Sequence, residues 1–449
     1  MGLFDKLLGK KTETPSLAAS EQPAMAEPQA PEAPIEAPQS TEAQTPVAPE
    51  QSVAVESQPP VAASEPSAET APAPAQAAPA EPTPAPAQSP VITPTTVESP
   101  VVPAPAENPA QQANQVASNI LVIGDIFTDA FIQLPEGSAK VIKEADGREW
   151  LALPFGQKPP YDHVDIVRSV GPSPNAAVSM ARLGLAPHLM AWVGDDATGV
   201  EAIQHLKDEN VGTDTMITEA GNKTSYWYVL RYGADRTMLV RSEKYKYEWQ
   251  DPAVAPEWIY LAYIGEDSWD LHEKLADYLA RNPGVKFALQ PGTFHFSWGI
   301  EKMKPLYEHA YIAIMNREEA ADVTGKPLES IHELAAGLHA LGPKIVVITD
   351  GPKGSYASYD GKVVTIPNYP DPAAPLDRTG AGDAFASTIV SALAQGQTME
   401  TALTWAPINS MSVVQKLGAQ AGLLTPGEVQ TYLSQAPAAY VVTELSLGA

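Results

Sequence analysis

The sequence predicts an α/β fold in which a doubly wound, mostly parallel sheet is flanked by helices and carries a small β-sheet lid. Beyond residue 118, short β-branched runs such as Ile120–Ile123 alternate with patterns of helical length. Over about 131–170 and 224–242, β-rich segments interrupt this alternation and are too long to be ordinary loops. Before residue 118, Pro, Ala and Glu dominate the composition, and the whole chain has 45 prolines in 449 residues. That composition predicts a long disordered tail.

These patterns divide the chain into segments. Residues 12–117 are expected to form a disordered linker rich in Pro, Ala and Glu, residues 118–437 the α/β domain, and residues 438–449 a C-terminal tail. In residues 1–11, Leu3, Phe4, Leu7 and Leu8 fall on one helical face beside three lysines. This pattern is typical of a short amphipathic helix that docks weakly on a membrane surface or a protein partner. A short frayed terminus explains the same residues.

The overall composition excludes several kinds of partner. The formal net charge is −26, whereas binding to nucleic-acid phosphates needs clustered Lys and Arg, so nucleic acid is not an expected partner. The chain has no cysteine, which excludes disulfides and thiolate metal sites. No apolar run approaches the roughly 20 residues that span a bilayer. The expected location is the cytoplasm, at the inner membrane face if residues 1–11 dock there.

The segment from Asp377 to Asp383 carries the candidate chemistry. It reads Asp-Arg-Thr-Gly-Ala-Gly-Asp and opens an apolar run of helical length that ends before Gly396. Glycines allow a tight turn, so that unpaired N–H groups at a helix N-terminus can point at one anion. A carboxylate beside such a cradle can accept a proton from an attacking hydroxyl. The candidate catalytic residues are Asp383, Gly380, Ala381 and Gly382.

This segment closely resembles the D-T-x-G-A-G-D signature of the ribokinase-like (PfkB) carbohydrate kinases. The resemblance extends over about 119–434 through several motifs in the family's order. It implies a ribokinase-like fold with a β-sheet lid over the sugar. It also implies that Asp383 is the catalytic base and that the amides of Gly380 to Gly382 form the anion hole.

Two segments resemble the family's substrate motifs. Gly124-Asp125-Ile126-Phe127-Thr128-Asp129 resembles the first substrate loop, in which an Asp binds sugar hydroxyls. Gly171 to Asn175 resembles the G-G-x-x-x-N motif, except that Val170 stands where the first glycine usually lies, and two prolines stiffen the loop before a helix expected over 176–183. The substrate-binding residues implied by the resemblance are Asp125, Asp129, Gly171, Asn175 and Asp383.

Two further segments resemble the nucleotide and metal motifs. Asn316-Arg317-Glu318-Glu319 matches N-x-x-E, which in the family sets Mg²⁺ and the phosphates. Residues i and i+3 of a first helical turn face the same way, so Asn316 and Glu319 can share one hydrated Mg²⁺, although the same residues also fit an ordinary capping box. The segment 349–354 is similar to the T-x-G-x-x-G nucleotide loop. The implied nucleotide-binding residues are Asn316, Thr349, Gly351, Gly354 and Gly382.

The resemblance also implies a candidate K⁺ site. Asp377 and Thr379 of the signature would provide one half, and backbone carbonyls of residues 418–422 the other. Gly422 stands about where some relatives offer a Ser hydroxyl, so one oxygen is missing from the implied ligand set. Moderate activation by K⁺ is expected.

The sequence therefore predicts an ATP- and Mg²⁺-dependent kinase that phosphorylates a hydroxyl of a sugar or a sugar-containing small molecule. A nucleoside kinase of the adenosine type shares all these motifs and stays an alternative. A second alternative is a non-catalytic sugar- or nucleotide-binding module. The presence of Asp383, Asn316 and Glu319 argues against that module, since an inactive protein is free to lose them. A homodimer formed through the lid is a further expectation.

Overall fold

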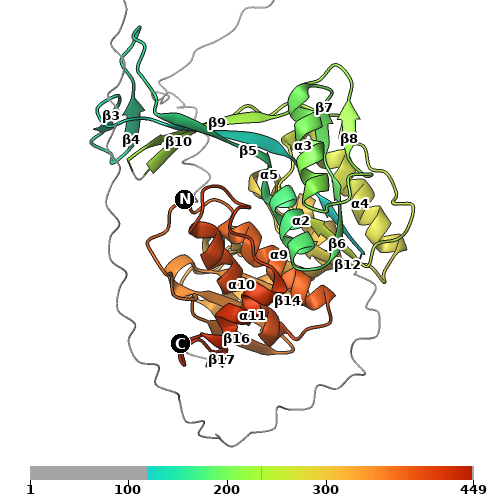
Figure 1. Cartoon of the computed structure of the whole chain (residues 1–449). Coiled ribbons are helices and arrows are strands. Elements are labelled where there is room, and N and C mark those ends of the chain that lie inside the picture. The colour runs from blue at the N-terminus through green and yellow to red at the C-terminus, as the bar shows by residue number, and fades with distance from the viewer. Residues whose placement is uncertain (1–118, 234, 447–449) are drawn as a thin grey trace, which may run out of the picture. The chain divides into compact units, whose positions relative to one another are not determined.

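The computed structural model describes residues 119–233 and 235–446, so the predictions for residues 1–11 and 12–117 fall outside the described residues. The predicted fold class is confirmed (Figure 1). The main sheet has the strand order β17-β16-β15-β14-β13-β12-β11-β1-β6. In that order the strands are Thr443–Glu444, Lys362–Ile366, Ser355–Tyr359, Ile345–Thr349, Ala310–Asn316, Lys286–Leu289, Trp258–Leu261, Asn119–Ile123 and Ala186–Met190. From β6 to β14 all neighbours are parallel, and β14 to β17 pair antiparallel.

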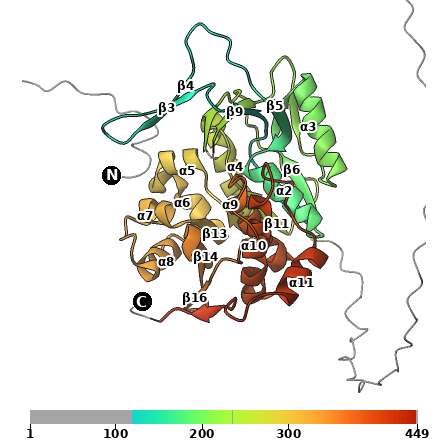
Figure 2. The ribbon, with the colours of Figure 1, turned by 60° about the vertical axis from the view of Figure 1, so that its left-hand side comes forward.

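Helices cover both faces of this sheet, because its central strands are apolar on both faces. In β1, Ile120 and Val122 pack into one core cluster, and Leu121 and Ile123 into the other. The first cluster is covered by α2 (Pro172–Arg182), α3 (Ala197–Asp208), α9 (Ala381–Ala394), α10 (Met399–Val414) and α11 (Pro426–Ser434). The second is covered by α4 (Trp269–Arg281), α5 (Thr293–Trp298), α6 (Ile300–His309), α7 (Arg317–Thr324) and α8 (Ile331–His339). Figure 2 shows α5 to α8 and α9 to α11 on opposite sides of the sheet.

The predicted lid is a separate four-stranded sheet in the order β10-β9-β2-β5. Its strands are Asp235–Leu239, Tyr226–Tyr232, Phe127–Gln133 and His163–Val170. A hairpin of β3 (Lys140–Lys143) and β4 (Glu149–Ala152) is inserted between β2 and β5, and β7 (Trp192–Gly194) pairs with β8 (Ile217–Glu219). The lid begins at Phe127, earlier than predicted. Asp129 therefore lies on a lid strand instead of in a loop.

Three local predictions can be compared with the structure. The helix after Gly171 begins at Pro172, not at residue 176, because a first helical turn tolerates proline. The sequence Thr425-Pro426-Gly427-Glu428 predicts a capping box, and the structure confirms it, since Thr425 and Glu428 cap α11 reciprocally. The segment predicted as a C-terminal tail contributes the edge strand β17. Within the described ranges, no helix combines the length and apolar character needed to cross a bilayer.

The parallel strands place their carboxyl ends along one edge of the sheet, where ligands of open α/β folds bind. In the order β14, β13, β12, β11, β1, this edge presents Thr349, Asn316, Gln290, Tyr263 and Asp125 at or just beyond the strand ends. The predicted nucleotide motifs thus lie at one end of the edge and the predicted substrate motif at the other. Gln290 lies between them.

Candidate active site

The segment Gly380 to Gly382, predicted to be an anion cradle, lies at the N-terminus of α9, where the N–H of Ala381 already donates to the carbonyl oxygen of Arg378 at 3.5 Å. Gly380 is the N-cap residue with φ of 79°, and a Cβ at this position would lie 2.3 Å from Cβ of Ala419, so only glycine fits. In the described part of the chain, the N–H groups of Gly382 and Asp383 have no hydrogen-bond partner. A Cβ added at Gly382 would meet open space. Two free donors therefore face a space that an anion can occupy.

The side chain of Asp383 is held from both sides. Asn175 Nδ2 donates to its Oδ2 at 2.9 Å, and Gln290 Nε2 donates to its Oδ1 at 3.1 Å. The hydroxyl of Tyr260 in turn donates to Oε1 of Gln290. Burial raises the pKa of Asp383, and the two amide donors partly offset this effect. The result is an oriented carboxylate with raised basicity, as a general base requires.

On the substrate side, two acidic groups are buried. The hydroxyl of Tyr247 donates to both oxygens of Asp125 at 3.0 Å, and burial raises the pKa of Asp125 to about 7. Burial and the charge of Asp377 raise the pKa of Asp129 to about 7. Among described residues, Asp129 Oδ1 and the neighbouring Trp227 Nε1 have no hydrogen-bond partner. Because Asp129 and Trp227 are paired in register, they offer an acceptor and a donor on one face of the lid.

The predicted substrate loop meets the signature through α2. Gly171 has φ of 128°, and a Cβ there would lie 2.8 Å from the carbonyl oxygen of Asp125, so the two loops touch only with glycine at this position. Helix α2 then carries Asn175, which is 3% exposed, to the carboxylate of Asp383. Gly171 thus lies against the loop of Asp125, and Asn175 contacts Asp383, so these four residues lie in one connected region.

A cavity of about 490 Å³ lies on the other side of the cradle. Its lining includes the predicted nucleotide residues Thr349, Gly351, Gly354 and Gly382, together with Arg378. Arg378 is exposed, and within residues 119–233 and 235–446 its guanidinium group has no hydrogen bond or ion pair. It occupies the second position of the signature, where the family pattern has Thr. Among the described residues that line the cavity, Arg378 is the one basic side chain.

Asn316 and Glu319, by contrast, form a reciprocal capping box. Asn316 Oδ1 accepts from the N–H of Glu319 at 2.8 Å, and Glu319 Oε2 accepts from the N–H of Asn316 at 2.9 Å. Burial raises the pKa of Glu319. The described residues contain no group of three or more His, Cys, Asp or Glu that could hold a metal. One carboxylate with water and phosphates fits the way Mg²⁺ is held in nucleotide sites.

The first residue of the signature, Asp377, joins three segments. Its Oδ1 accepts from the N–H and the hydroxyl of Thr379 at 3.0 and 2.7 Å, and its Oδ2 accepts from the N–H of Gly418 at 3.1 Å. Arg236 of the lid lies 3.4 Å from the same carboxylate. The two segments of the implied K⁺ site, around Thr379 and Gly418, are thus adjacent. The carboxylate of Asp377 between them is hydrogen-bonded to donors of the protein.

The motif search missed several residues of the site. Gln290 directly follows strand β12, and its place beyond a parallel strand is a signal that could have identified it. Arg317, inside the N-x-x-E segment, pairs with Asp350 of the nucleotide loop through largely buried side chains. Arg236 lies on an exposed lid strand, and no local pattern distinguishes it.

Known proteins resemble this chain in sequence and in fold. The profile described as "pfkB family carbohydrate kinase" matches residues 165–426. A ribokinase from Bacillus subtilis (strain 168) is 30% identical over 273 residues, which cover 59% of this chain and 87% of that protein.

Among solved structures, an Arabidopsis thaliana ribokinase complexed with ribose and ATP matches with a TM-score of 0.59 and 20% identity, over 71% of this chain and 99% of that one. A nucleoside kinase from Methanocaldococcus jannaschii, described as an archaeal member of the ribokinase family, matches with a TM-score of 0.57 and 20% identity, over 71% and 98%. These two likenesses concern the fold. The family match over more than half of the chain settles the assignment: this protein belongs to the PfkB family of carbohydrate kinases.

Proposed function

We propose that this carbohydrate kinase transfers the γ-phosphoryl group of ATP to a hydroxyl of a sugar, with Asp383 as the general base. The observation that carries the proposal is the position of Asp383. Its own N–H and that of Gly382 have no partner among the described residues, and it lies between the 490 Å³ cavity and the substrate-side residue Asn175. Asp383 would remove the proton of the attacking hydroxyl. The N–H groups of Gly382 and Asp383 would stabilise the charge that develops on the phosphoryl oxygens.

The nucleotide would occupy the cavity lined by Thr349, Gly351 and Gly354. Its phosphates would lie toward Gly382, where Arg378 offers a guanidinium group that has no partner among the described residues and can make charge-assisted hydrogen bonds. Glu319 and Asn316 would hold Mg²⁺ through water. When bound, the ion supplies neutralisation of the phosphate charge.

The substrate would lie under the lid, between Asp125, Asp129 and Asn175, with Gly171 allowing the close approach of the loops. Carboxylates and amides bind vicinal hydroxyl groups, as both sugars and nucleosides present them. A sugar is favoured because the matching family profile is that of carbohydrate kinases. The nucleoside kinase alternative stays open as an outcome of the test below.

The experiment that tests this function is a screen of ADP release from ATP and Mg²⁺ over pentoses, hexoses, phosphosugars and nucleosides. Sugar-dependent ADP release, with the phosphorylated sugar identified by mass spectrometry, is the expected result. Release with nucleosides alone would establish the alternative. Nucleotide binding without release for any acceptor would leave the non-catalytic binding module as the function.

A K⁺ site beside the cradle belongs to the proposal. Its support is the adjacency of the Asp377 and Thr379 segment to the loop 418–422, through the 3.1 Å contact between Asp377 and the N–H of Gly418. Because Asp377 already accepts protein donors, the ion would depend mainly on backbone carbonyls. Rates compared in KCl and NaCl at equal ionic strength test it. Moderate activation by K⁺ is expected, and identical rates would exclude a functional site.

A homodimer through the lid is proposed from the lid's outer face. Ala130 on β2 is paired with Ile166 on β5 and with Tyr228 on β9, and Tyr228 is in turn paired with Leu239 on β10. In this row, Ile166 and Tyr228 are each 47% exposed and Leu239 is 52% exposed. An exposed apolar row of this kind is typical of a surface that another protein covers. Light scattering should give a dimer for the native protein and a monomer for Tyr228→Glu. A monomeric native protein would exclude the dimer.

A further inference from the structure

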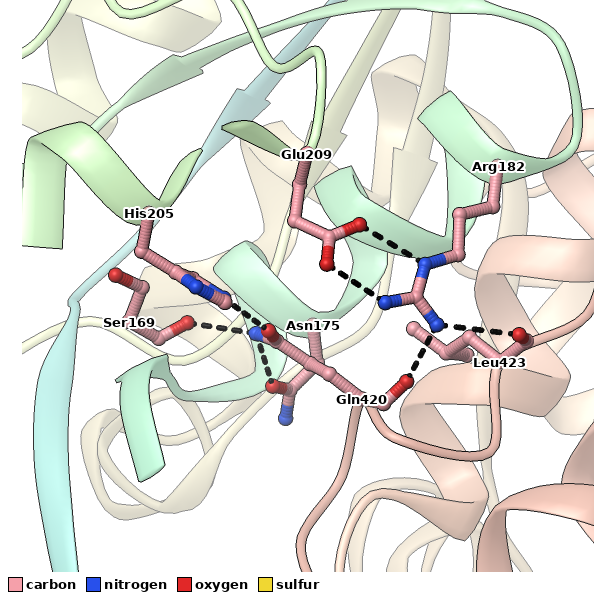
Figure 3. Close-up of polar contacts among 7 residues, drawn as sticks. All are labelled: Ser169, Asn175, Arg182, His205, Glu209, Gln420 and Leu423. Atoms are coloured by element: carbon pink, nitrogen blue, oxygen red, sulfur yellow. Dashed lines mark hydrogen bonds and ion pairs between the residues drawn. The ribbon is translucent and has the colours of Figure 1, made fainter. Parts of the chain in front are cut away.

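A chain of hydrogen bonds, the amide relay, joins His205 to the proposed base Asp383 through the buried residues Gln420 and Asn175. Figure 3 shows the part of the relay from His205 to Asn175. His205 Nε2 lies 2.9 Å from Gln420 Oε1, Gln420 Nε2 lies 3.1 Å from Asn175 Oδ1, and Asn175 Nδ2 lies 2.9 Å from Asp383 Oδ2. Gln420 and Asn175 are 4% and 3% exposed. The four residues come from α3, the loop between α10 and α11, α2 and α9, so the relay connects distant segments to one carboxylate.

The direction of every hydrogen bond in the relay follows from one backbone carbonyl. The carbonyl oxygen of Ser169, which can only accept, lies 2.7 Å from Gln420 and fixes the amide nitrogen on that side. Gln420 Oε1 must then accept, so His205 carries its proton on Nε2. The second N–H of Gln420 donates to Asn175 Oδ1. Asn175 is left with its NH₂ group facing Asp383.

Ser169 itself has an unusual conformation. Its φ is 55°, a region that residues other than glycine rarely adopt, and the residue is completely buried. Its hydroxyl donates to the carbonyl oxygen of Ala202 at 2.9 Å. Strain of this kind persists where the surroundings fix it, often at functional sites. Here the strained residue is the one that orients the amide of Gln420.

The backbone of Gln420 is clamped as well. Arg182 donates to both carboxylate oxygens of Glu209 at 2.9 and 2.7 Å, and to the carbonyl oxygens of Gln420 and Leu423 at 2.8 and 3.2 Å (Figure 3). A planar guanidinium group that makes four such bonds holds a loop in one position. The side chain of Gln420 is thus presented to Asn175 from a fixed backbone.

We propose that Gln420 is a positioning residue of the phosphotransfer reaction. It holds the amide of Asn175 in the one orientation in which NH₂ donates to Asp383, and so keeps the base ionised and correctly aimed. Without Gln420, the amide of Asn175 is free to turn its oxygen toward the carboxylate, which favours the protonated acid. This inference rests on the proposed role of Asp383. The other groups facing Asp383 are Gln290 and, behind it, Tyr260.

The test compares Gln420→Met with the matched control Gln415→Met. The side chain of Gln415 donates to the carbonyl oxygen of Ala373 at 3.1 Å and is outside the relay. In Gln420→Met, the pKa of Asp383, followed by NMR of ¹³C-carboxyl-labelled aspartate, is expected to rise. The acid limb of the kcat/KM profile should move to higher pH, and kcat at pH 7 should fall by up to about tenfold, with the affinity for ATP unchanged. The control should behave as the native protein.

A double-mutant cycle shows whether Gln420 acts through Asn175. If it does, the double variant of Gln420→Met with Asn175→Ala has the same kcat as Asn175→Ala alone. If the losses of kcat in the two single variants add up in the double variant, the proposal is overturned. If Gln420→Met does not unfold cooperatively, and so is not properly folded, a second variant replaces it. His205→Phe changes a half-buried position and interrupts the relay at the end that is farthest from Asp383. It should move the acid limb in the same direction by a smaller amount, and an unchanged pKa of Asp383 would overturn the proposal.

The two proposals fail in different ways. A native protein that releases no ADP with any sugar or nucleoside contradicts the phosphotransfer function. An active native protein whose Asp383 titrates identically in Gln420→Met contradicts the relay alone. Because the NMR titration needs no substrate, it reports on the relay in either case.

Discussion

The guanidinium group of Arg236, on lid strand β10, lies 3.4 Å from the buried carboxylate of Asp377 at the start of the signature. The same carboxylate accepts N–H groups from Thr379 and Gly418. The lid is therefore connected to the loop that positions the anion cradle. Removing the lid contact should affect the substrate more than the nucleotide.

Arg236→Gln tests this connection. The side chain of Arg236 is 40% exposed, and a contact of this kind contributes little, so the KM for the sugar is expected to rise by up to about fivefold with kcat nearly unchanged. Steady-state kinetics measure both constants. Arg241→Gln, which removes an exposed arginine that pairs with Glu243, is the control. Equal KM values in the two variants would show that the lid contact is not used.

Arg378→Thr, which restores the family pattern, tests the phosphate contact. Charge-assisted hydrogen bonds are strong, so the Kd for ATP should rise about tenfold or more, whereas the Kd for adenosine should stay the same. Calorimetry with the two ligands measures both. Arg148→Thr on the remote lid hairpin is the control. An equal rise in the Kd for ATP and in the Kd for adenosine would indicate a general disturbance of the cavity.

Two buried histidines, His272 and His295, make the stability of the protein depend on pH. Gly292 N–H donates to His295, His295 Nε2 lies 2.8 Å from His272 Nε2, and His272 donates to the carbonyl of Ser268. Burial lowers the pKa of His272 to about 4 and lowers the pKa of His295 as well. Both rings are therefore neutral in the folded protein. The unfolded chain takes up their protons below the ordinary pKa of about 6.5.

The free energy of unfolding should consequently fall as the pH decreases from about 6.5 toward 4, by up to about 1.4 kcal/mol per pH unit for each histidine. Urea unfolding at several pH values measures this slope. His272→Gln should reduce the slope, since one titrating group is removed. Equal slopes in the two proteins would contradict the assignment of neutral rings.

The substrate-side carboxyl groups predict a pH dependence of sugar binding. The pKa values of Asp125 and Asp129 are both raised to about 7, so each group is partly protonated near neutrality. Only the ionised form accepts hydrogen bonds from sugar hydroxyls on both oxygens. The KM for the sugar should therefore fall as the pH rises from 6 to 8, while the KM for ATP changes less. Asp129→Asn should flatten this dependence, and a KM that rises with pH would contradict it.

The fold and the contiguous parts of the site were predictable because their signals are local. The run Asp377 to Asp383 combines a glycine turn, a helix start and a carboxylate within seven residues, and the structure places all of them at one helix N-terminus. Hairpin β15–β16 is another case. The sequence pair Asp360-Gly361 is one that a type I′ turn prefers, and the φ values of these residues, 49° and 76°, are those that this turn requires.

The contacts that join distant segments were not predictable. The position of Gln290 just beyond β12 places it at the sheet edge, but no spacing rule predicts its hydrogen bond with Asp383, 93 positions away, or that of Gln420 with Asn175, 245 positions away. The capping box at Asn316 illustrates a different limit. A helix cap and a metal motif require the same residue types at the same spacing, so the pattern alone does not separate them.

The central claim, that Asp383 is the base of sugar phosphorylation, is tested most directly by Asp383→Asn. This change keeps the size of the side chain and removes its capacity to accept a proton. With the best acceptor from the screen, kcat should fall by about 10²-fold or more, while the Kd for ATP stays within about twofold of the native value. Asp277→Asn, on an exposed position of α4, controls for the loss of one charge. Near-normal turnover by Asp383→Asn would contradict the account.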